Sequence, residues 1–77
     1  MNIDIETKIE RWRIKAELFL EDNIKCFIKT IDGGYHSAEI LFVGLNYIIV
    51  YDFIKKEKFR IYWLDIFLFE EYKGRGK

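Results

Sequence analysis

The chain has 77 residues, of which 51% are hydrophobic and 18% are aromatic, and its 13 basic and 13 acidic side chains give a formal net charge of zero. A neutral chain has no global field that attracts nucleic acid or an acidic surface, so any such binding must be local. A domain this small buries only about 60% of its unfolded surface, so the high apolar content predicts that a second copy or a partner covers the excess.

The cysteine content and the ends of the chain bear on its compartment. Cys26 is the single cysteine, so neither an internal disulfide nor a C-x-x-C metal or redox motif is present. The first ten residues lack the features of a signal peptide, and no apolar run reaches about 18 residues. We therefore expect a cytoplasmic protein without membrane span, metal or cofactor, with one domain over residues 1–72 and a flexible basic tail over residues 73–77.

The first predicted element is an amphipathic helix over about residues 4–21. Its apolar residues recur at spacings of three and four, which places them on one stripe; they are Ile5, Ile9, Trp12, Ala16, Phe19 and Leu20. Thr7 and Glu10 have the spacing of a capping box, and Asp4 is an alternative N-cap. The polar residues 21–23 are expected to end the helix.

From Ile24 onward the hydrophobic period changes to two, which predicts strands over about residues 24–72. Cys26 alternates with isoleucines in the first strand and is expected to be a small buried hydrophobe. Asp32, Gly33 and Gly34 predict a tight turn, because glycine enters left-handed backbone conformations without steric cost.

Four further strands are expected at residues 35–43, 47–53, 59–63 and 66–72. The turn at residues 44–46 separates the first two of these, and a solvated loop rich in lysine, residues 55–58, separates the next two. One helix followed by five short, bent antiparallel strands buries its apolar face best as a small barrel capped by the helix.

Two of these strands are apolar on both faces, namely residues 47–51 and 66–69. An edge strand with this composition aggregates unless something covers it. We therefore expect a homo-oligomer in which the fourth and fifth strands of neighbouring subunits pair edge to edge. The predicted interface residues are Phe59, Ile61, Ile66, Phe67, Leu68 and Phe69.

The chain resembles the Sm-like (Lsm) family over roughly residues 5–72. Residues 28–52, IKTIDGGYHSAEILFVGLNYIIVYD, resemble its first signature, and residues 59–69, FRIYWLDIFLF, resemble its second. The resemblance implies a five-stranded antiparallel Sm-like or SH3-like barrel and a ring of six or seven subunits, a hexamer or heptamer, joined through the fourth and fifth strands. It also implies binding of single-stranded RNA rich in uridine or adenine.

The resemblance places Asn46 at the family's asparagine, which holds a base edge, but Val43 stands where the family has aspartate. Tyr62 and Trp63 replace the family's Arg-Gly pair; an aromatic ring can still stack on a base, but the hydrogen bonds of the arginine are lost. Repeated around a ring, the basic side chains of the lysine loop would form a positive rim. The candidate RNA-binding residues are Asn46, Tyr62, Trp63, Lys55, Lys56, Lys58 and Arg60.

No catalytic site is predicted. His36, Ser37 and Glu39 follow the glycine turn, but consecutive strand residues point to opposite faces, so His36 and Ser37 do not readily meet. They are expected to be surface polar residues, and we expect no enzyme. The alternative to RNA binding is a protein-interaction or assembly module of SH3-like shape, whose exposed aromatic residues bind a peptide or another subunit.

Overall fold

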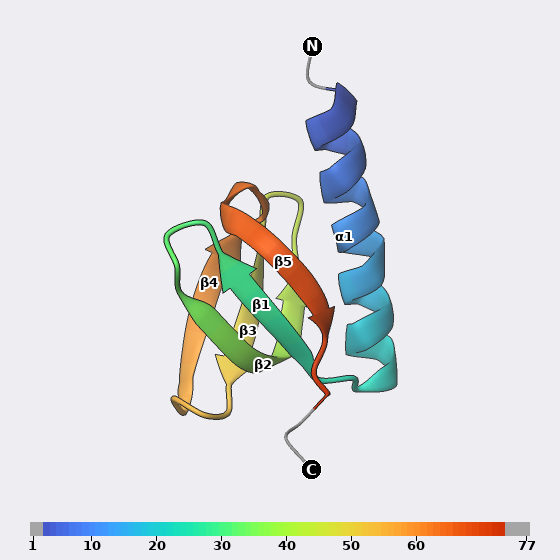
Figure 1. The fold of residues 1–77 in the computed structure, drawn as a ribbon. Helices are drawn as coiled ribbons and strands as arrows, with labels where there is room; N and C mark the ends of the chain where they lie inside the picture. The colour runs from blue at the N-terminus through green and yellow to red at the C-terminus, as the bar shows by residue number, and fades with distance from the viewer. Residues whose placement is uncertain (1–2, 74–77) are drawn as a thin grey trace.

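A computed structural model describes the backbone of residues 3–73 and the side chains of residues 7–73. Apart from Lys73, the predicted tail lies outside these residues, as do the side chains of Asp4 and Ile5. The elements in chain order are α1 (Ile3–Asp22), β1 (Cys26–Thr30), β2 (Tyr35–Val43), β3 (Tyr47–Asp52), β4 (Glu57–Tyr62), the 3-10 helix η1 (Trp63–Asp65) and β5 (Ile66–Glu71) (Figure 1).

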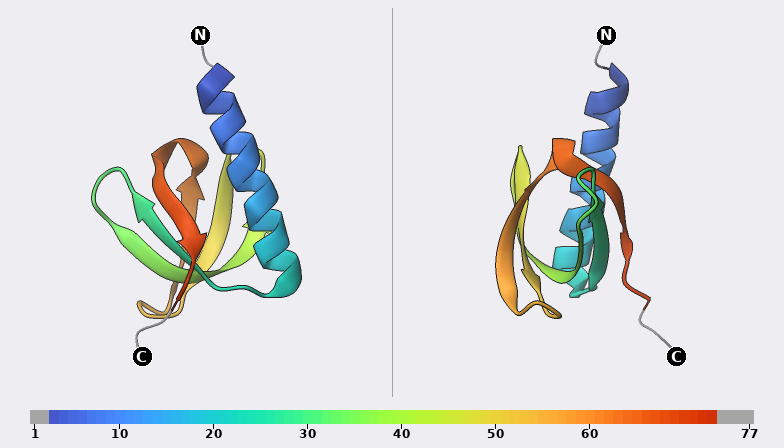
Figure 2. Two further views of the ribbon diagram at one scale, coloured as in Figure 1. Left: turned by 45° about the vertical axis from the view of Figure 1, so that its right-hand side comes forward. Right: turned by 60° about the vertical axis from the view of Figure 1, so that its left-hand side comes forward.

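All five strands belong to one antiparallel sheet in the order β4-β3-β2-β1-β5. The sheet is strongly curved (Figure 2), and the pairing register shifts between Ile40 and Phe42 in β2 and between Lys29 and Thr30 in β1. Such bulges bend a strand and increase its twist. β4 and β5 do not pair with each other, so the sheet stays open. The mainly β class with an N-terminal helix is confirmed, whereas a closed barrel is not.

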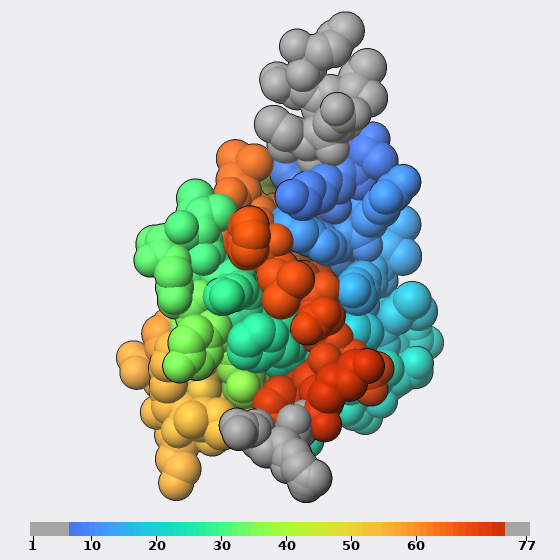
Figure 3. All heavy atoms as spheres, viewed as in Figure 1, coloured from blue at the N-terminus to red at the C-terminus, as the bar shows by residue number. Residues whose placement is uncertain are grey.

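Helix α1 matches the predicted range and packs along one side of the sheet (Figures 1 and 3). Ala16 and Phe19 are buried, and Ile9 and Trp12 pack against them. Leu20, predicted to belong to the same stripe, is 39% exposed. A capping box at Thr7 is wrong, because the helix begins four residues earlier, at Ile3.

The end of α1 agrees with the predicted stop at residues 21–23. Asn23 has a positive φ of 58°. Its N–H donates to the carbonyl of Leu20 at 3.4 Å, and the N–H of Ile24 donates to the carbonyl of Phe19 at 2.8 Å. These two bonds make a Schellman motif, which satisfies carbonyls that the helix end leaves free.

The tight turn between β1 and β2 is confirmed. Gly33 has a φ of 94°, a value that favours glycine. The Asp32 carboxylate accepts hydrogen bonds from the Thr30 hydroxyl and from the N–H of Gly34. The lysine loop is shorter than predicted, because Glu57 and Lys58 already belong to β4.

The core lies between α1 and the inner face of the curved sheet. It contains mostly aliphatic residues with two aromatic rings from the sheet side and one from the helix: Ala16, Phe19, Cys26, Ile28, Ala38, Ile40, Ile48, Val50, Ile61, Trp63, Ile66 and Phe69. Cys26 is fully buried, as predicted. Burial raises the pKa of its thiol to about 12, so hardly any thiolate is present at neutral pH.

We therefore expect that an aromatic disulfide reagent such as DTNB does not label native Cys26 at pH 8 on the timescale of minutes, and labels it fully in denaturant. A Cys26→Ala/Lys29→Cys variant is the control, because Lys29 is exposed, and it should react at the rate of a free thiol. Rapid, complete labelling of the native wild type would contradict the buried placement of Cys26.

Candidate functional site

The predicted RNA-binding residues are divided between the two ends of the β3–β4 hairpin. Tyr47 pairs with Tyr62 at one end, where Asn46 precedes β3. Lys55 and Lys56 lie in the turn at the other end. A strand of six residues spans roughly 17 Å, so these residues do not form one compact site.

At the Asn46 end, the β2–β3 turn is fastened to η1 by Trp63. The backbone N–H of Trp63 donates to the carbonyl of Asn46 at 3.0 Å, and its indole Nε1–H donates to the carbonyl of Gly44 at 3.1 Å. Trp63 is only 1% exposed. Its suggested role in base stacking is therefore corrected: the side chain is buried in the core, and it positions the turn instead.

We call the cavity beside this turn the loop pocket. It has a volume of about 280 Å³ and is lined by Ile9, Leu45, Asn46, Tyr62, Trp63 and Leu64. Leu45 in the β2–β3 turn and Leu64 in η1 are 75% and 67% exposed. The amide of Asn46 offers both a donor and an acceptor.

An aromatic row continues from the loop pocket onto the side of the sheet that faces away from the core. Ring centroids lie 5.6 Å apart for Tyr47 and Tyr62 and 6.1 Å apart for Phe42 and Tyr47. The Arg60 guanidinium lies over the Tyr47 ring, 5.0 Å from its centroid. Hydrogen bonding to Tyr62, together with the proximity of Tyr47, raises the pKa of Arg60. Like any arginine, Arg60 is protonated at neutral pH.

At the opposite end of the hairpin, Lys55 is held by the fold. Its Nζ donates to the carbonyl of Tyr35 at 2.8 Å and lies 3.8 Å from Oδ2 of Asp52. It also lies over the rings of Tyr35 and Phe59. A phosphate contact would have to compete with these interactions, so Lys55 is a weaker candidate than Lys58, which is exposed on β4.

The turn around Lys55 is organised by Asp52, which sequence reasoning did not single out. Its side chain is fully buried and accepts hydrogen bonds from the N–H groups of Ile54 and Lys55, at 3.0 and 2.8 Å, and from Nδ1 of His36 at 3.0 Å. Burial raises the pKa of the Asp52 carboxyl, but the bonds from Lys55, His36 and Ile54 outweigh it, so the net pKa lies below its ordinary value.

His36 is thus not the surface residue that the sequence predicts. Its side chain is only 11% exposed, and its ring packs on Phe59 with 4.5 Å between centroids. Ser37 lies on the other face of β2, where it lines a separate cavity with Phe27 and Tyr35, so the two residues project to opposite faces as expected.

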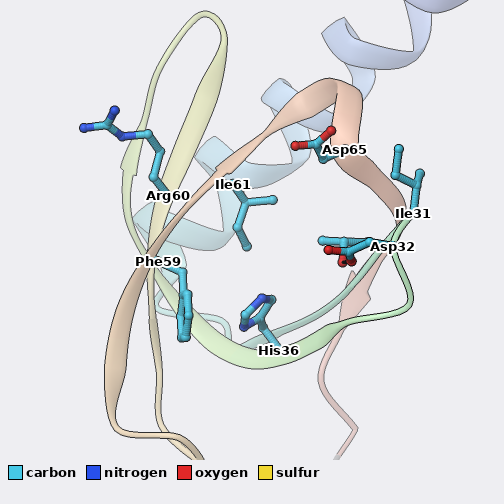
Figure 4. A pocket seen from close by; sticks show the side chains of 8 residues that line it. Ile31, Asp32, His36, Phe59, Arg60, Ile61 and Asp65 are labelled. Carbon is cyan, nitrogen blue, oxygen red and sulfur yellow. Dashed lines mark hydrogen bonds between the residues drawn. The ribbon is translucent and has the colours of Figure 1, made fainter.

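His36 forms one wall of a hollow of about 350 Å³ on the inner side of β4 (Figure 4). Asp32 and Asp65 point into the hollow, whereas the Arg60 side chain extends away from it (Figure 4). The hydrogen bond from the Thr30 hydroxyl, and then that from Gly34, lowers the pKa of Asp32. The hollow is therefore negatively charged and disfavours phosphate. No group of three His, Cys, Asp or Glu residues that could hold a metal ion occurs within the described part of the chain.

The predicted interface residues fall into two sets. Ile61, Ile66 and Phe69 are buried in this subunit, so their side chains are not free for a neighbour, and that part of the prediction is corrected. Phe67 is 63% exposed, and Phe59 and Leu68 are half-buried. The edge pairing itself is untested and stays a prediction.

Helix α1 lacks an apolar stretch of the kind that crosses a bilayer, and it is the one α-helix among residues 3–73. No protein-family model, curated protein or solved structure matches this chain.

Proposed function

We propose that the chain is an Sm-like barrel subunit that assembles into a six- or seven-membered ring and binds single-stranded RNA at the loop pocket. The strand order supports the assembly, since it leaves β4 and β5 as the two edge strands of one curved sheet. A β4 edge that accepts the β5 edge of a neighbour pairs backbone groups that an edge strand otherwise leaves to water. On β5, the carbonyl of Phe69 already has a partner, because Nζ of Lys15 donates to it at 2.9 Å.

Exposed apolar surface on the β5 edge supports this pairing. Phe67, on β5, is 63% exposed and is one of the most exposed apolar side chains. A contact along this edge covers it.

The observation that carries RNA binding is the loop pocket. Its walls are the exposed Leu45 and Leu64 with Tyr62, and Asn46 contributes an amide at the rim. Two hydrogen bonds from Trp63 hold the turn before any ligand arrives, which lowers the ordering cost of binding. In a ring these pockets repeat with the subunit symmetry, so one strand of RNA can engage several of them.

The test is the solution mass by light scattering, followed by titration of the same sample with fluorescent oligo-U and oligo-A at low and moderate salt. We expect a closed ring that binds at least one oligomer, and we expect Asn46→Ala to weaken binding about ten-fold, because a buried base edge loses its hydrogen bonds.

Leu45→Asp is expected to abolish binding, and Ile54→Asp is its matched control, because Ile54 is 64% exposed and lies at the other end of the hairpin. A stable monomer would contradict the assembly. A closed ring that binds neither oligo-U nor oligo-A would contradict the proposal that the protein binds RNA.

One observation favours a protein-interaction or assembly module as the second candidate. Large apolar side chains are exposed away from the loop pocket as well, including Ile14 and Leu18 on α1 and Ile31 beside the hollow. A protein partner bound through this surface would show affinity that hardly depends on salt and is unchanged in Leu45→Asp, which distinguishes it from RNA.

A further inference from the structure

On the side of β4 that faces away from the core, every second residue is a cation or an aromatic residue. Lys58, Arg60 and Tyr62 are exposed, whereas Phe59 and Ile61 between them point inward. The inward side of β4 packs on the core. Residues at two-residue spacing share one face of a strand, so the two positive charges and the tyrosine form a line along the edge.

β3 supplies a second line beside the first. Tyr47, Ile49 and Tyr51 are half-buried on the outer face, because the alternate residues of β3 are fully buried. The strand register aligns these three residues with Tyr62, Arg60 and Lys58, in that order. We call this surface of β3 and β4 the outer face.

Among the described residues, the outer face combines aromatic rings with two positive charges. Carboxylates at its border include Glu57, exposed at the start of β4, and Glu39, the β2 partner of Tyr51, which lies 3.6 Å from Nζ of Lys25. The other exposed aromatic surface, around Phe27 and Tyr35, carries Glu70 and Glu71 instead.

The arginine on the outer face is held in place before any ligand binds. Its guanidinium lies over the Tyr47 ring, 5.0 Å from the centroid, so it has less rotamer freedom to lose when a phosphate binds. Arg binds phosphate through two parallel hydrogen bonds, and exposed tyrosine rings stack on bases of any sequence. The line from Tyr62 to Lys58 is on the order of 13 Å long, which accommodates a short stretch of nucleic acid.

We propose that single-stranded RNA continues from the loop pocket across the outer face, with its phosphates on Arg60 and Lys58 and a base stacked on Tyr51. This inference rests on the proposed function and extends it, because it names a second contact surface and the order in which the strand meets the two. The loop pocket holds one base, and the outer face supplies affinity that does not depend on sequence.

The test compares the variant Lys58→Gln/Arg60→Gln with the control Lys29→Gln/Arg11→Gln, which removes the same charge from exposed positions elsewhere. Binding of long and short oligo-U is measured over a series of salt concentrations. For the long oligomer, we expect the outer-face variant to lower the slope of log affinity against log salt by about 1.4, which corresponds to two lost phosphate contacts. The control should leave the slope unchanged, and the short oligomer should respond little to either variant.

Tyr51→Leu is expected to weaken binding of the long oligomer about ten-fold, because a stacked base is lost. Melting temperature and solution mass are recorded for each variant, so that only folded, assembled proteins are compared. Equal losses of RNA affinity in the outer-face and control variants overturn the inference, because the RNA then contacts basic side chains all over the surface rather than the outer face. RNA binding that falls in Asn46→Ala but is unchanged in every outer-face variant also overturns it and leaves the proposed function intact. Absence of RNA binding by the wild-type ring overturns both.

Discussion

Replacing Trp63 by alanine is expected to lower the free energy of unfolding by about 3–5 kcal/mol. Trp63 is the largest fully buried side chain, and it lies in η1 between α1 and the inner face of the sheet. Its removal leaves a cavity that a core this small cannot collapse to fill. Since small domains have total stabilities of only about 5–15 kcal/mol, the variant should be largely unfolded well below the melting temperature of the wild type. Urea denaturation followed by circular dichroism measures the effect.

Trp63→Phe separates the packing of Trp63 from its hydrogen bond. A phenylalanine ring keeps most of the volume but cannot donate to the carbonyl of Gly44, so we expect a loss of about 1–2 kcal/mol. The same variant loosens the β2–β3 turn and alters one wall of the loop pocket, so RNA affinity should fall as well. Trp12→Ala on the half-buried side of α1 is the control and should cost less than Trp63→Ala. Equal costs at both positions would contradict the placement of Trp63 in the core.

Local patterns predicted those parts of the fold that local chemistry determines. The range of β2 agrees at both ends with the predicted residues 35–43, and the turn at Gly33 has the positive φ that Asp-Gly-Gly implies. Because consecutive strand residues point to opposite faces, at most one of Tyr62 and Trp63 is expected to lie in the core. Which of the two is buried depends on the position of η1, and no short-range pattern contains that information.

The features that sequence reasoning missed all depend on contacts between distant residues. His36 meets Asp52, which lies 16 positions away, only because β2 and β3 pair in one register. Tyr47 joins the candidate site because it lies opposite Tyr62. Lys55 was predicted to face phosphate, but a carbonyl 20 positions earlier in the chain takes its Nζ.

Only part of the candidate site could be predicted, because residues far apart in the sequence complete it. Asn46 was found through a motif resemblance, and the structure brings it together with Tyr62 at the loop pocket. The predicted interface included apolar side chains that the subunit itself buries. The sequence pattern shows that both faces of a strand are apolar, but it does not show which face lies in the core. Phe67 and Phe69 differ in this respect: the first is 63% exposed and the second only 4%.

Asp52→Ala is expected to destabilise the protein by about 3 kcal/mol at neutral pH, because it leaves two backbone N–H groups and the imidazole of His36 without their acceptor. In a domain of this size, each kcal/mol shifts the melting temperature by about 4–8 °C, so thermal unfolding resolves the loss easily. Asp65→Ala is the matched control: its side chain is exposed, so a change within about 0.5 kcal/mol is expected. Similar losses for the two variants would mean that the Asp52 network adds nothing beyond a generic charge.

The contribution of the Asp52 carboxylate should also depend on pH in one direction. Its pKa is lower in the folded protein than the ordinary value of 3.8, so the unfolded chain binds the proton more readily than the folded chain does. The stabilisation is therefore complete above about pH 5, begins to decline as the pH falls through 3.8, and is gone once the pH is below the folded-state pKa. The wild type should lose stability over this range faster than Asp52→Asn, whose side chain does not titrate, and the two curves should converge in acid. Parallel curves down to pH 2 would show that the hydrogen bonds from His36, Ile54 and Lys55 do not favour the ionised form of Asp52.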